Sequence, residues 1–342
     1  MPTTSSGRNV LGEPIEPVRW GVLSTANIGI TKVIPAMSHA EISQVYAIAS
    51  RSLRTAEAAA AQLGIPRAYG SYRELFEDID IEAVYIPLPN SLHPEWTKAA
   101  AAAGKHILCE KPLAVTSAGA REMVDACDQA GVLLMEAFMY RLHPMWLRTK
   151  ELIDSGAIGE LRAVQTIFSY FNDDPANIRN IPGVGGGALY DIGCYAVNVS
   201  RMLFGSEPTD VKGSVRRDER LGTDVITSAL LIFDDGHATF TASTQMEPSQ
   251  RVEILGTHGR IVVEIPFNIP PDRPTRVLHV AGGEPPVAPE IEIHEISTAD
   301  PYAIQADAFS RAIRDGSPVP VSPHDAVANL GVIERIFADA TG

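Results

Sequence analysis

An alternation of short apolar runs with helical patterns covers the first 136 residues and restricts the fold more than any other feature. Apolar runs at 18–23, 43–50, 83–87, 106–109 and 132–136 predict strands, and the segments 53–63 and 117–130 predict helices between them. Strands that alternate with helices of about ten to fifteen residues form parallel βαβ units. We therefore expect a doubly wound parallel sheet, whose ligands bind at the carboxyl ends of its strands.

The turn after the first strand reads S-T-A-N-I-G, where dinucleotide-binding chains carry G-x-G-x-x-G. Ser24, Ala26 and Gly29 stand at the three glycine positions, so the motif alone is weak. Small residues still let the backbone approach a pyrophosphate, and the N-terminus of the next helix attracts anions. An ordinary tight turn between strand and helix is the alternative interpretation.

The end of the second strand favours one cofactor over another. NAD-binding domains place an Asp or Glu there, on the ribose 2′-hydroxyl, whereas this chain has Ser50, Arg51 and, close behind, Arg54. A guanidinium pairs with a 2′-phosphate and stacks on adenine. The pattern predicts NADP, with a solvated surface arginine as the alternative.

Polar residues also follow the third and fourth strands. The segment P-L-P-N-S-L-H ends in Asn90 and His93, which we expect to be exposed at the carboxyl edge of the sheet. His93 has a second interpretation, as an inert, hydrogen-bonded residue in the first turn of the next helix. Glu110 and Lys111, followed by Pro112, place two charges where the nicotinamide end of a cofactor is expected. A surface ion pair is the alternative there.

The segment from Gly185 to Gly205 predicts one helix that ends at a left-handed glycine cap. Positions 189, 192, 196, 199 and 203 form an apolar stripe, while Asp191, Tyr195 and Asn198 share another face. A buried helix rarely carries such a face, because each unpaired polar group costs about 1–3 kcal/mol. Periodicity leaves two interpretations, a face in solvent or the wall of a site.

The second half of the chain predicts a different sheet. Strands are expected at 161–170, 211–217, 226–233, 237–244, 251–256 and 260–265, and Asp234-Asp235-Gly236 is typical of a hairpin turn. Short connections favour a mostly antiparallel sheet with one face on the 185–205 helix and one face free for self-association. Helices are expected at 147–155, 302–315 and 323–338, an exposed ribbon at 278–296, and a functional loop at 171–184.

Composition excludes several classes of function. Lys and Arg number 28 against 42 Asp and Glu, a net charge of −14, which disfavours nucleic acid as a partner. No apolar run approaches the roughly 20 residues of a membrane span. Three cysteines without C-x-x-C spacing indicate reduced thiols in the cytoplasm. His and Cys do not cluster along the sequence, so no metal is expected.

Five motifs occur in order: S-T-A-N-I-G, P-L-P-N-S-L-H, E-K-P, M-E-A-F-M-Y-R-L-H-P and G-G-G-A-L-Y-D-I-G-C-Y. Together they closely resemble the Gfo/Idh/MocA oxidoreductases, in the branch of glucose–fructose oxidoreductase, NADP-dependent D-xylose dehydrogenase and dihydrodiol dehydrogenase. The resemblance implies a Rossmann domain at 18–144, after a flexible arm at 1–17 that carries no secretory signal. It also implies an α/β domain at 145–342 with an open, mostly antiparallel sheet, which binds substrate and forms a homodimer or homotetramer.

The resemblance also implies roles for individual residues. Lys111 is expected at the nicotinamide and the reacting carbon, Tyr195 as the proton-transferring residue and Asp191 as its supporting acid. A phenol with a reference pKa near 10 needs a cation to stabilise its phenolate, and Lys111 supplies one; His143 is a competing base. The residues expected to bind the cofactor are Ser24, Thr25, Ala26, Asn27, Ile28, Ser50, Arg51, Arg54, Tyr72, Pro87, Leu88, Asn90, His93, Glu110, Lys111, Arg141, Arg179 and Tyr302.

The expected reaction is hydride transfer between NADP and a sugar carbinol, with oxidation of aldose C1 to a lactone as the leading interpretation. Substrate contacts are expected in the loop at 172–183. Three alternatives stay open: a ketosugar reductase of deoxysugar metabolism, a trans-dihydrodiol dehydrogenase, and a non-catalytic NADP-binding regulator. The presence of both Lys111 and Tyr195 argues against the regulator.

Overall fold

Two compact units make up the computed structural model, which describes residues 15–282 and 290–340. The first unit contains the chain up to residue 114 together with 118–139 and 302–326, and the second contains 115–117, 140–301 and the chain from 327 onward. The domain boundary expected at 144/145 therefore differs from this division, since 302–326 belong to the first unit. The arm expected at 1–17 lies outside the described residues except for its last three.

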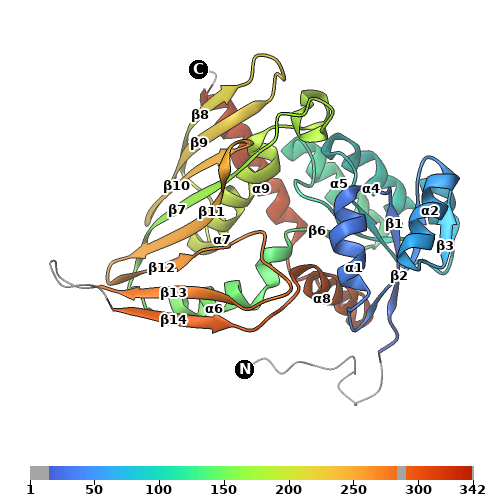
Figure 1. The fold of residues 1–342 in the computed structure, drawn as a ribbon, viewed down its shortest axis with the longest axis horizontal. Helices are drawn as coiled ribbons and strands as arrows, with labels where there is room; N and C mark the ends of the chain where they lie inside the picture. Colours follow the sequence, from blue (N-terminus) through green and yellow to red (C-terminus); the bar gives the residue numbers. More distant parts are fainter. Residues whose placement is uncertain (1–14, 283–289, 341–342) are drawn as a thin grey trace. The chain divides into compact units, whose positions relative to one another are not determined.

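The first unit is built on a parallel sheet in the order β3-β2-β1-β4-β5-β6 (Figure 1). Its strands are β1 (Val18–Leu23), β2 (Ser43–Ala49), β3 (Arg67–Tyr69), β4 (Ala83–Ile86), β5 (His106–Cys109) and β6 (Leu134–Glu136). Every pairing is parallel, which confirms the doubly wound prediction. Strand β3 was not predicted, because three residues are too short for a hydrophobic period to appear.

Helices complete this unit, and one of them comes from far along the chain. They are α1 (Ile34–Met37), α2 (Leu53–Leu63), α3 (Tyr72–Glu77), α4 (His93–Ala102), α5 (Ser117–Ala130) and α8 (Pro301–Asp315), with a π-helical turn at Gly29–Val33 before α1. Trp20 on β1 is fully buried; its ring lies 5.5 Å from Phe309 of α8, and its indole N–H donates to Ser310 Oγ at 3.0 Å. Burial of this large ring explains why α8 belongs to the first unit rather than the second.

The second unit is built on an eight-stranded sheet in the order β14-β13-β12-β11-β7-β10-β9-β8. Its strands are β7 (Leu161–Phe171), β8 (Asp210–Arg217), β9 (Asp224–Phe233), β10 (Gly236–Ser243), β11 (Gln245–Gly256), β12 (Gly259–Val263), β13 (Thr275–Ala281) and β14 (Ile291–Ile296). Only β7 and β10 pair in parallel, so the prediction of a mostly antiparallel sheet is confirmed.

The expectation of an exposed ribbon at 278–296 was wrong in part. Its ends belong to β13 and to the edge strand β14, which pair from Thr275↔Ile296 to Val280↔Ile291. Prolines and glutamates in the middle of the segment obscured the alternation that marks these strands. Residues 283–289 lie outside the described part of the chain.

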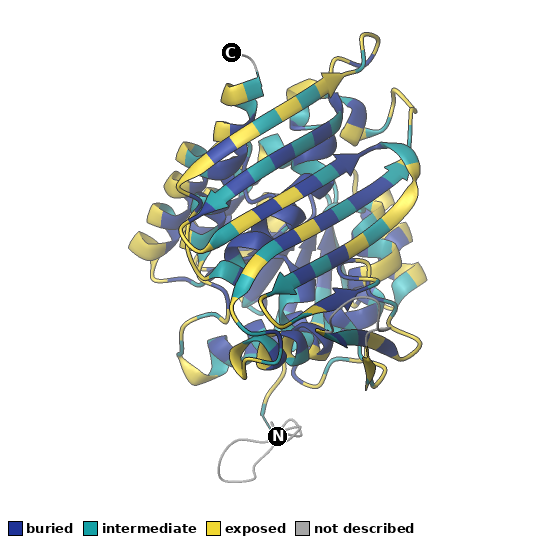
Figure 2. Cartoon of the chain, turned by 90° about the vertical axis from the view of Figure 1, so that its left-hand side faces the viewer, coloured by how far each residue is buried: buried dark blue, intermediate teal, exposed yellow. Residues whose placement is uncertain are grey.

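Helices cover one face of this sheet and leave the other open (Figures 1 and 2). They are α6 (Pro144–Asp154), α7 (Cys194–Phe204) and α9 (Pro323–Ala340). Short helical turns lie at Met139–Leu142, Ile178–Asn180, Pro182–Val184 and Leu189–Gly193, and another at Asn90–Leu92 precedes α4 in the first unit. Along β9, buried positions alternate with partly exposed ones, so one set of side chains faces the helices and the other faces the open side. Among the residues described, none of the helices combines the length and apolar character needed to span a bilayer.

Candidate active site

The turn after β1 links three neighbouring strand ends in the first unit. Ser24 has a left-handed backbone with φ 74°, and its N–H donates to Ala49 O at the end of β2 at 2.8 Å. Its hydroxyl donates to Pro87 O after β4 at 3.3 Å and accepts the Ala26 N–H at 3.2 Å. The serine therefore replaces the first glycine of the fingerprint and holds the turn open, which suits close approach of a dinucleotide backbone.

The end of β2 presents the cation that NADP would need. Arg51 and Arg54 are exposed there. Tyr72, at the start of α3, is buried with its ring edge-on to Trp96 at 4.7 Å. Burial raises the pKa of Tyr72, and the nearby charge of Arg51 opposes that rise. This set of a guanidinium, a phenol and an open turn fits a phosphorylated adenosine ribose.

His93 differs from its first interpretation. Its side chain is fully buried as the first residue of α4, not exposed at the sheet edge. One ring nitrogen lies 2.8 Å from Leu88 O and the other 3.0 Å from Pro112 O, and burial lowers its pKa. The structure thus supports the inert interpretation: His93 ties the loop after β4 to the loop after β5.

The loop after β5 carries Glu110 and Lys111, both half-buried. Glu110 Oε1 accepts the phenol of the buried Tyr85 at 2.6 Å, and its other oxygen accepts the Lys111 N–H at 3.3 Å. Burial and the Glu110 charge raise the pKa of Tyr85. The Lys111–Pro112 bond is cis. Tyr302 packs against the core of this same unit and influences Tyr85 electrostatically.

In the second unit, the segment 189–204 forms a π-helical turn followed by α7 and ends at left-handed Gly205, as predicted. The face with Tyr195 and Asn198 is buried, with exposed fractions of 5% and 0%, so the interpretation as a solvent face was wrong. Asn198 Oδ1 accepts the phenol of Tyr140 at 2.5 Å. A hydrogen bond from a buried tyrosine therefore accounts for the residue to which sequence reasoning assigned no role.

Tyr195 lies in an aromatic cluster that fixes the direction of its ring. Phe267, Phe168 and Tyr140 have ring centroids 5.0, 5.7 and 5.8 Å from it. Offset and edge contacts of this kind are worth about 0.5–1.5 kcal/mol each beyond area burial. The cluster therefore leaves the ring of Tyr195 little rotational freedom.

Asp191 is an anchored carboxylate one helical turn before Tyr195. Its Oδ2 accepts the Tyr170 phenol at 2.6 Å and lies 3.1 Å from Arg179 Nε. Burial together with the Asp191 charge raises the pKa of Tyr170. Asp191 thus joins β7, the loop before the helix and the helix itself, and it positions Arg179, one of the predicted residues.

The glycines before this helix are required by backbone packing inside the second unit. A Cβ on Gly186 would lie 2.6 Å from Arg179 O, and one on Gly187, with φ +124°, would collide with the Asp224 carboxylate. Asp224 accepts the Leu189 N–H at 2.7 Å and the Thr227 hydroxyl at 2.8 Å. Close packing against Asp224 and the preceding loop therefore accounts for glycine at both positions.

The side chain of His143, the competing base, is buried, and both of its ring nitrogens contact the backbone. Its Nδ1 accepts the Met145 N–H at 3.1 Å as the cap of α6, and its Nε2 lies 3.3 Å from Ala299 O. Burial lowers its pKa. The capping and carbonyl contacts of His143 give it a structural explanation.

Three supporting residues were missed by sequence reasoning: Tyr140, Tyr170 and Asp224. Tyr170 ends a predicted strand, Tyr140 lies in the motif M-E-A-F-M-Y-R-L-H-P outside the predicted elements, and Asp224 begins β9. No local pattern links any of them to a helix at 189–204. Arg141 is half-buried in the turn Met139–Leu142. Lys111 belongs to the first unit, whereas Asp191, Tyr195, Arg141 and Arg179 belong to the second.

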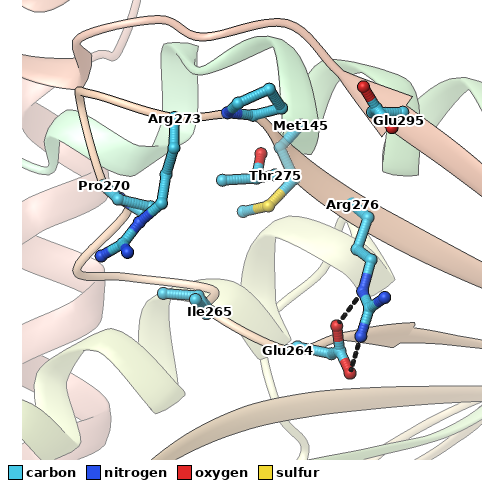
Figure 3. A pocket seen from close by; sticks show the side chains of 9 residues that line it. Met145, Glu264, Ile265, Pro270, Arg273, Thr275, Arg276 and Glu295 are labelled. Carbon is cyan, nitrogen blue, oxygen red and sulfur yellow. Dashed lines mark hydrogen bonds and ion pairs between the residues drawn. The ribbon is translucent and has the colours of Figure 1, made fainter.

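A cavity of about 420 Å³ in the second unit contains none of the predicted residues. Figure 3 shows Arg276 and Glu264 paired across it, with Nε–Oε2 and Nη2–Oε1 distances of 2.6 and 3.2 Å. Met145 of α6 and Thr275 of β13 also line it. It offers a satisfied ion pair rather than a reactive group.

Two protein-family models match this chain, one over the residues of the parallel sheet and one over much of the second sheet. The model of the oxidoreductase family with an NAD-binding Rossmann fold matches residues 18–138, and the model of the GFO/IDH/MocA C-terminal domain matches 146–262. A D-xylose 1-dehydrogenase (NADP(+)) of Haloferax volcanii is 37% identical over 94% of this chain and 97% of its own.

Two further similarities point to another sugar chemistry. A dTDP-3,4-didehydro-2,6-dideoxy-alpha-D-glucose 3-reductase of Streptomyces violaceoruber is 34% identical over 95% of both chains. A crystal structure of a 3-ketoreductase from Actinomadura kijaniata with NADP and TDP-benzene has a TM-score of 0.87 at 28% identity, covering 94% of this chain and 98% of that one.

Proposed function

Because the chain belongs to the Gfo/Idh/MocA family of NAD(P)-binding sugar oxidoreductases, we propose that it uses NADP to oxidise C1 of an aldose to a lactone. The observation that carries the proposal is Tyr195, a buried phenol oriented by aromatic rings one turn after the anchored Asp191. The similarity to an NADP-dependent D-xylose dehydrogenase supports the substrate class.

Each residue has a role in this proposal. The bound nicotinamide supplies hydride acceptance and donation. Tyr195 takes the proton from the sugar hydroxyl as the hydride leaves carbon, and the Lys111 ammonium stabilises the phenolate needed for that transfer. Asp191 positions Arg179 and the start of α7 through the bonds described above, so it acts as a positioning residue.

Variants of a related protein support the choice of Lys111 and Tyr195. The 3-ketoreductase of Actinomadura kijaniata has been crystallised with one tyrosine changed to Phe and with one lysine changed to Ala or Glu. Those two positions are separated in that chain by the same number of residues as Lys111 and Tyr195 here. The shared spacing supports a common tyrosine–lysine chemistry.

The central experiment replaces the proton carrier. Tyr195→Phe should lower kcat with NADP and aldose by about 10²–10⁴-fold, because general acid–base catalysis contributes that much. NADPH absorbance measures turnover, and NADP binding, followed by fluorescence quenching, should persist. Near-normal turnover in a folded variant would refute the role of Tyr195.

The proposed preference for NADP over NAD rests on Arg51 at the end of β2. Arg51→Ala should raise KM for NADP by about 10- to 150-fold, since a charge-assisted pair is worth roughly 1.5–3 kcal/mol, while KM for NAD changes little. Arg148→Ala, on exposed α6, is the matched control. Equal effects on both cofactors would contradict a contact with the 2′-phosphate.

Reduction of a ketosugar is the second candidate function. It is favoured by the similarity to dTDP-sugar 3-reductases and to a 3-ketoreductase crystallised with TDP-benzene. The same residues run that reaction in reverse, with Tyr195 donating the proton. An NADP(H) assay with aldoses, trans-dihydrodiols and dTDP-ketosugars distinguishes the candidates by the substrate with the highest kcat/KM.

The open face of the eight-stranded sheet is the proposed contact between copies in a homodimer or homotetramer. It carries Ile167 and Leu230 among polar residues such as Gln165 and Thr241. Ile167→Asp should convert the oligomer to monomer in light scattering. We also propose a cytoplasmic location, because Cys109, Cys127 and Cys194 are free and buried, as suits a reducing compartment.

A further inference from the structure

The outer edge of the second sheet brings two histidines and a glutamate together on one face. His279 on β13 pairs with Glu292 on β14, and Val277 pairs with His294. Residues two apart on a strand share a face, so Glu292 and His294 lie on the same side as His279. The three are separated by up to 15 positions in sequence, which is why no metal-ligand spacing was visible.

The distances within this cluster are those of ligands around one ion. Glu292 Oε2 lies 3.5 Å from His279 Nδ1, and Glu292 Oε1 lies 3.6 Å from His294 Nε2. One ligand atom from each residue falls within 4.8 Å of the others. Zinc bonds of about 2.0–2.1 Å in a tetrahedron place neighbouring ligand atoms about 3.3 Å apart. Small side-chain rotations bring all three atoms to that spacing.

His279 is held in the tautomer that ligation requires. Its Nε2 lies 3.0 Å from Ala157 O, a carbonyl that can only accept, so Nε2 carries the hydrogen. In the neutral ring, Nδ1 is then left with a lone pair toward Glu292. Backbone carbonyls orient metal-binding histidines in the same way.

His294 supplies the second, independent observation. Its Nε2 is buried and has no hydrogen-bond partner. The side chain is 12% exposed, and its cross-strand neighbour Val277 is fully buried. An unsatisfied buried ring nitrogen destabilises the folded chain, and a bound cation would remove that cost.

We propose that His279, Glu292 and His294 bind one divalent transition metal of the zinc type. Two imidazoles and one carboxylate suit zinc and its neighbours, whereas Mg²⁺ and Ca²⁺ prefer all-oxygen sites. Glu292 is 63% exposed, so water completes the coordination from the solvent side. The ion fastens edge strand β14 to β13 and is separate from the proposed hydride transfer.

The competing explanation is a protonated His279 paired with Glu292. In that pair the other oxygen of Glu292 stays 3.6 Å from His294 Nε2, beyond hydrogen-bond distance, whereas a metal would bind all three residues directly. The two explanations differ in what they predict for added zinc, since an ion pair gains nothing from it.

The experiment titrates the full-length, EDTA-treated protein with ZnCl₂ by calorimetry. We expect one Zn²⁺ per chain and a dissociation constant raised on the order of tenfold or more by Glu292→Gln or His294→Ala. His237→Ala, an exposed histidine on β10, is the matched control and should bind zinc like the wild type. Equal zinc affinity in the wild type and Glu292→Gln would overturn the site.

Hydrogen exchange provides a second readout that does not depend on a folded variant. Zinc should slow amide exchange in 291–296 of the wild type, because an edge strand is otherwise easily opened. MgCl₂ at equal concentration should leave that exchange unchanged. Unchanged exchange with zinc would likewise overturn the proposal. The variants should keep the wild-type kcat for the sugar reaction, so failure here is distinguishable from failure of the proposed function.

Discussion

The strand-end loops of the first unit and the 189–204 helix of the second carry the candidate residues in different ways. In the first unit, Ser24, Arg51 and Glu110 follow the buried strands β1, β2 and β5, and the partners of Ser24 and Glu110 lie on neighbouring strands or at their ends. Ser24 bonds to the ends of β2 and β4, and Glu110 bonds to Tyr85 on β4. In the second unit, Tyr195 is oriented by residues from elsewhere in the chain, including Phe267 and Tyr140.

This difference shows which candidate residues can be recognised from local sequence and which cannot. A parallel sheet brings its strand ends together by topology alone, so candidates there are visible as motifs. The side chains of a helix that packs on a sheet are instead oriented by the residues that contact them from other elements. Asp224 and Tyr170 serve the helix from β9 and β7, and no spacing in the sequence connects them to it.

The largest expected effect tests whether the two regions serve one reaction. Lys111→Met and Tyr195→Phe should each lower kcat by about 10²–10⁴-fold, because both stabilise the same proton transfer. Their double variant should lose about as much as the worse single variant, since residues that act as a unit are not additive. Steady-state kinetics with NADP and the best aldose measures all three.

Multiplicative losses in the double variant would contradict a shared step. Circular dichroism and NADP binding serve as controls for folding. In that case the strand-end lysine and the helix tyrosine would have independent roles.

A smaller effect tests the dependence of the helix on distant residues. Asp224→Ala leaves the Leu189 N–H and the Thr227 hydroxyl without their acceptor and should cost about 1–3 kcal/mol of stability. Thermal unfolding should show a lower Tm, and kcat should fall because the start of the helix loosens.

Asp235→Ala, in the exposed β9–β10 turn, is the control for this change. Asp224→Asn keeps one acceptor oxygen and should lie between the two. A wild-type Tm in Asp224→Ala would show that the helix is held without its distant carboxylate.

The smallest effect is a pH dependence from His93 in the first unit. Burial places its folded pKa below the ordinary 6.5, so below pH 6.5 the unfolded chain binds a proton that the folded chain does not. Stability is complete above pH 6.5 and should fall as the pH drops toward 5. Denaturant unfolding at several pH values measures this slope.

His93→Gln should flatten the slope, while His237→Gln should leave it unchanged. The half-buried His106 and the buried His143 also have lowered pKa values because of desolvation, so part of the slope should remain. An unaltered slope in His93→Gln would contradict the buried tie between the two loops.

Much of the architecture follows from local pattern. Strand β1, helix α2 and helix α5 have the predicted bounds, and Gly64 and Gly205 end their helices with positive φ. The assignments that failed depended on contacts. Helix α8 has the predicted position, but its place in the first unit depends on Trp20, and β14 is a strand because β13 pairs with it.

The sequence by itself determined the two sheets, the strand-end candidates and the family, because periodicity and motifs are local properties of a chain. Tertiary structure decided the rest. It buried the Tyr195 face and gave Asn198 a partner. It also required glycine at position 187 beside Asp224, and it brought His279 to Glu292 and His294. Each of these depends on groups from separate elements meeting within hydrogen-bond or ligand distance, and only the packing of the folded chain sets those distances.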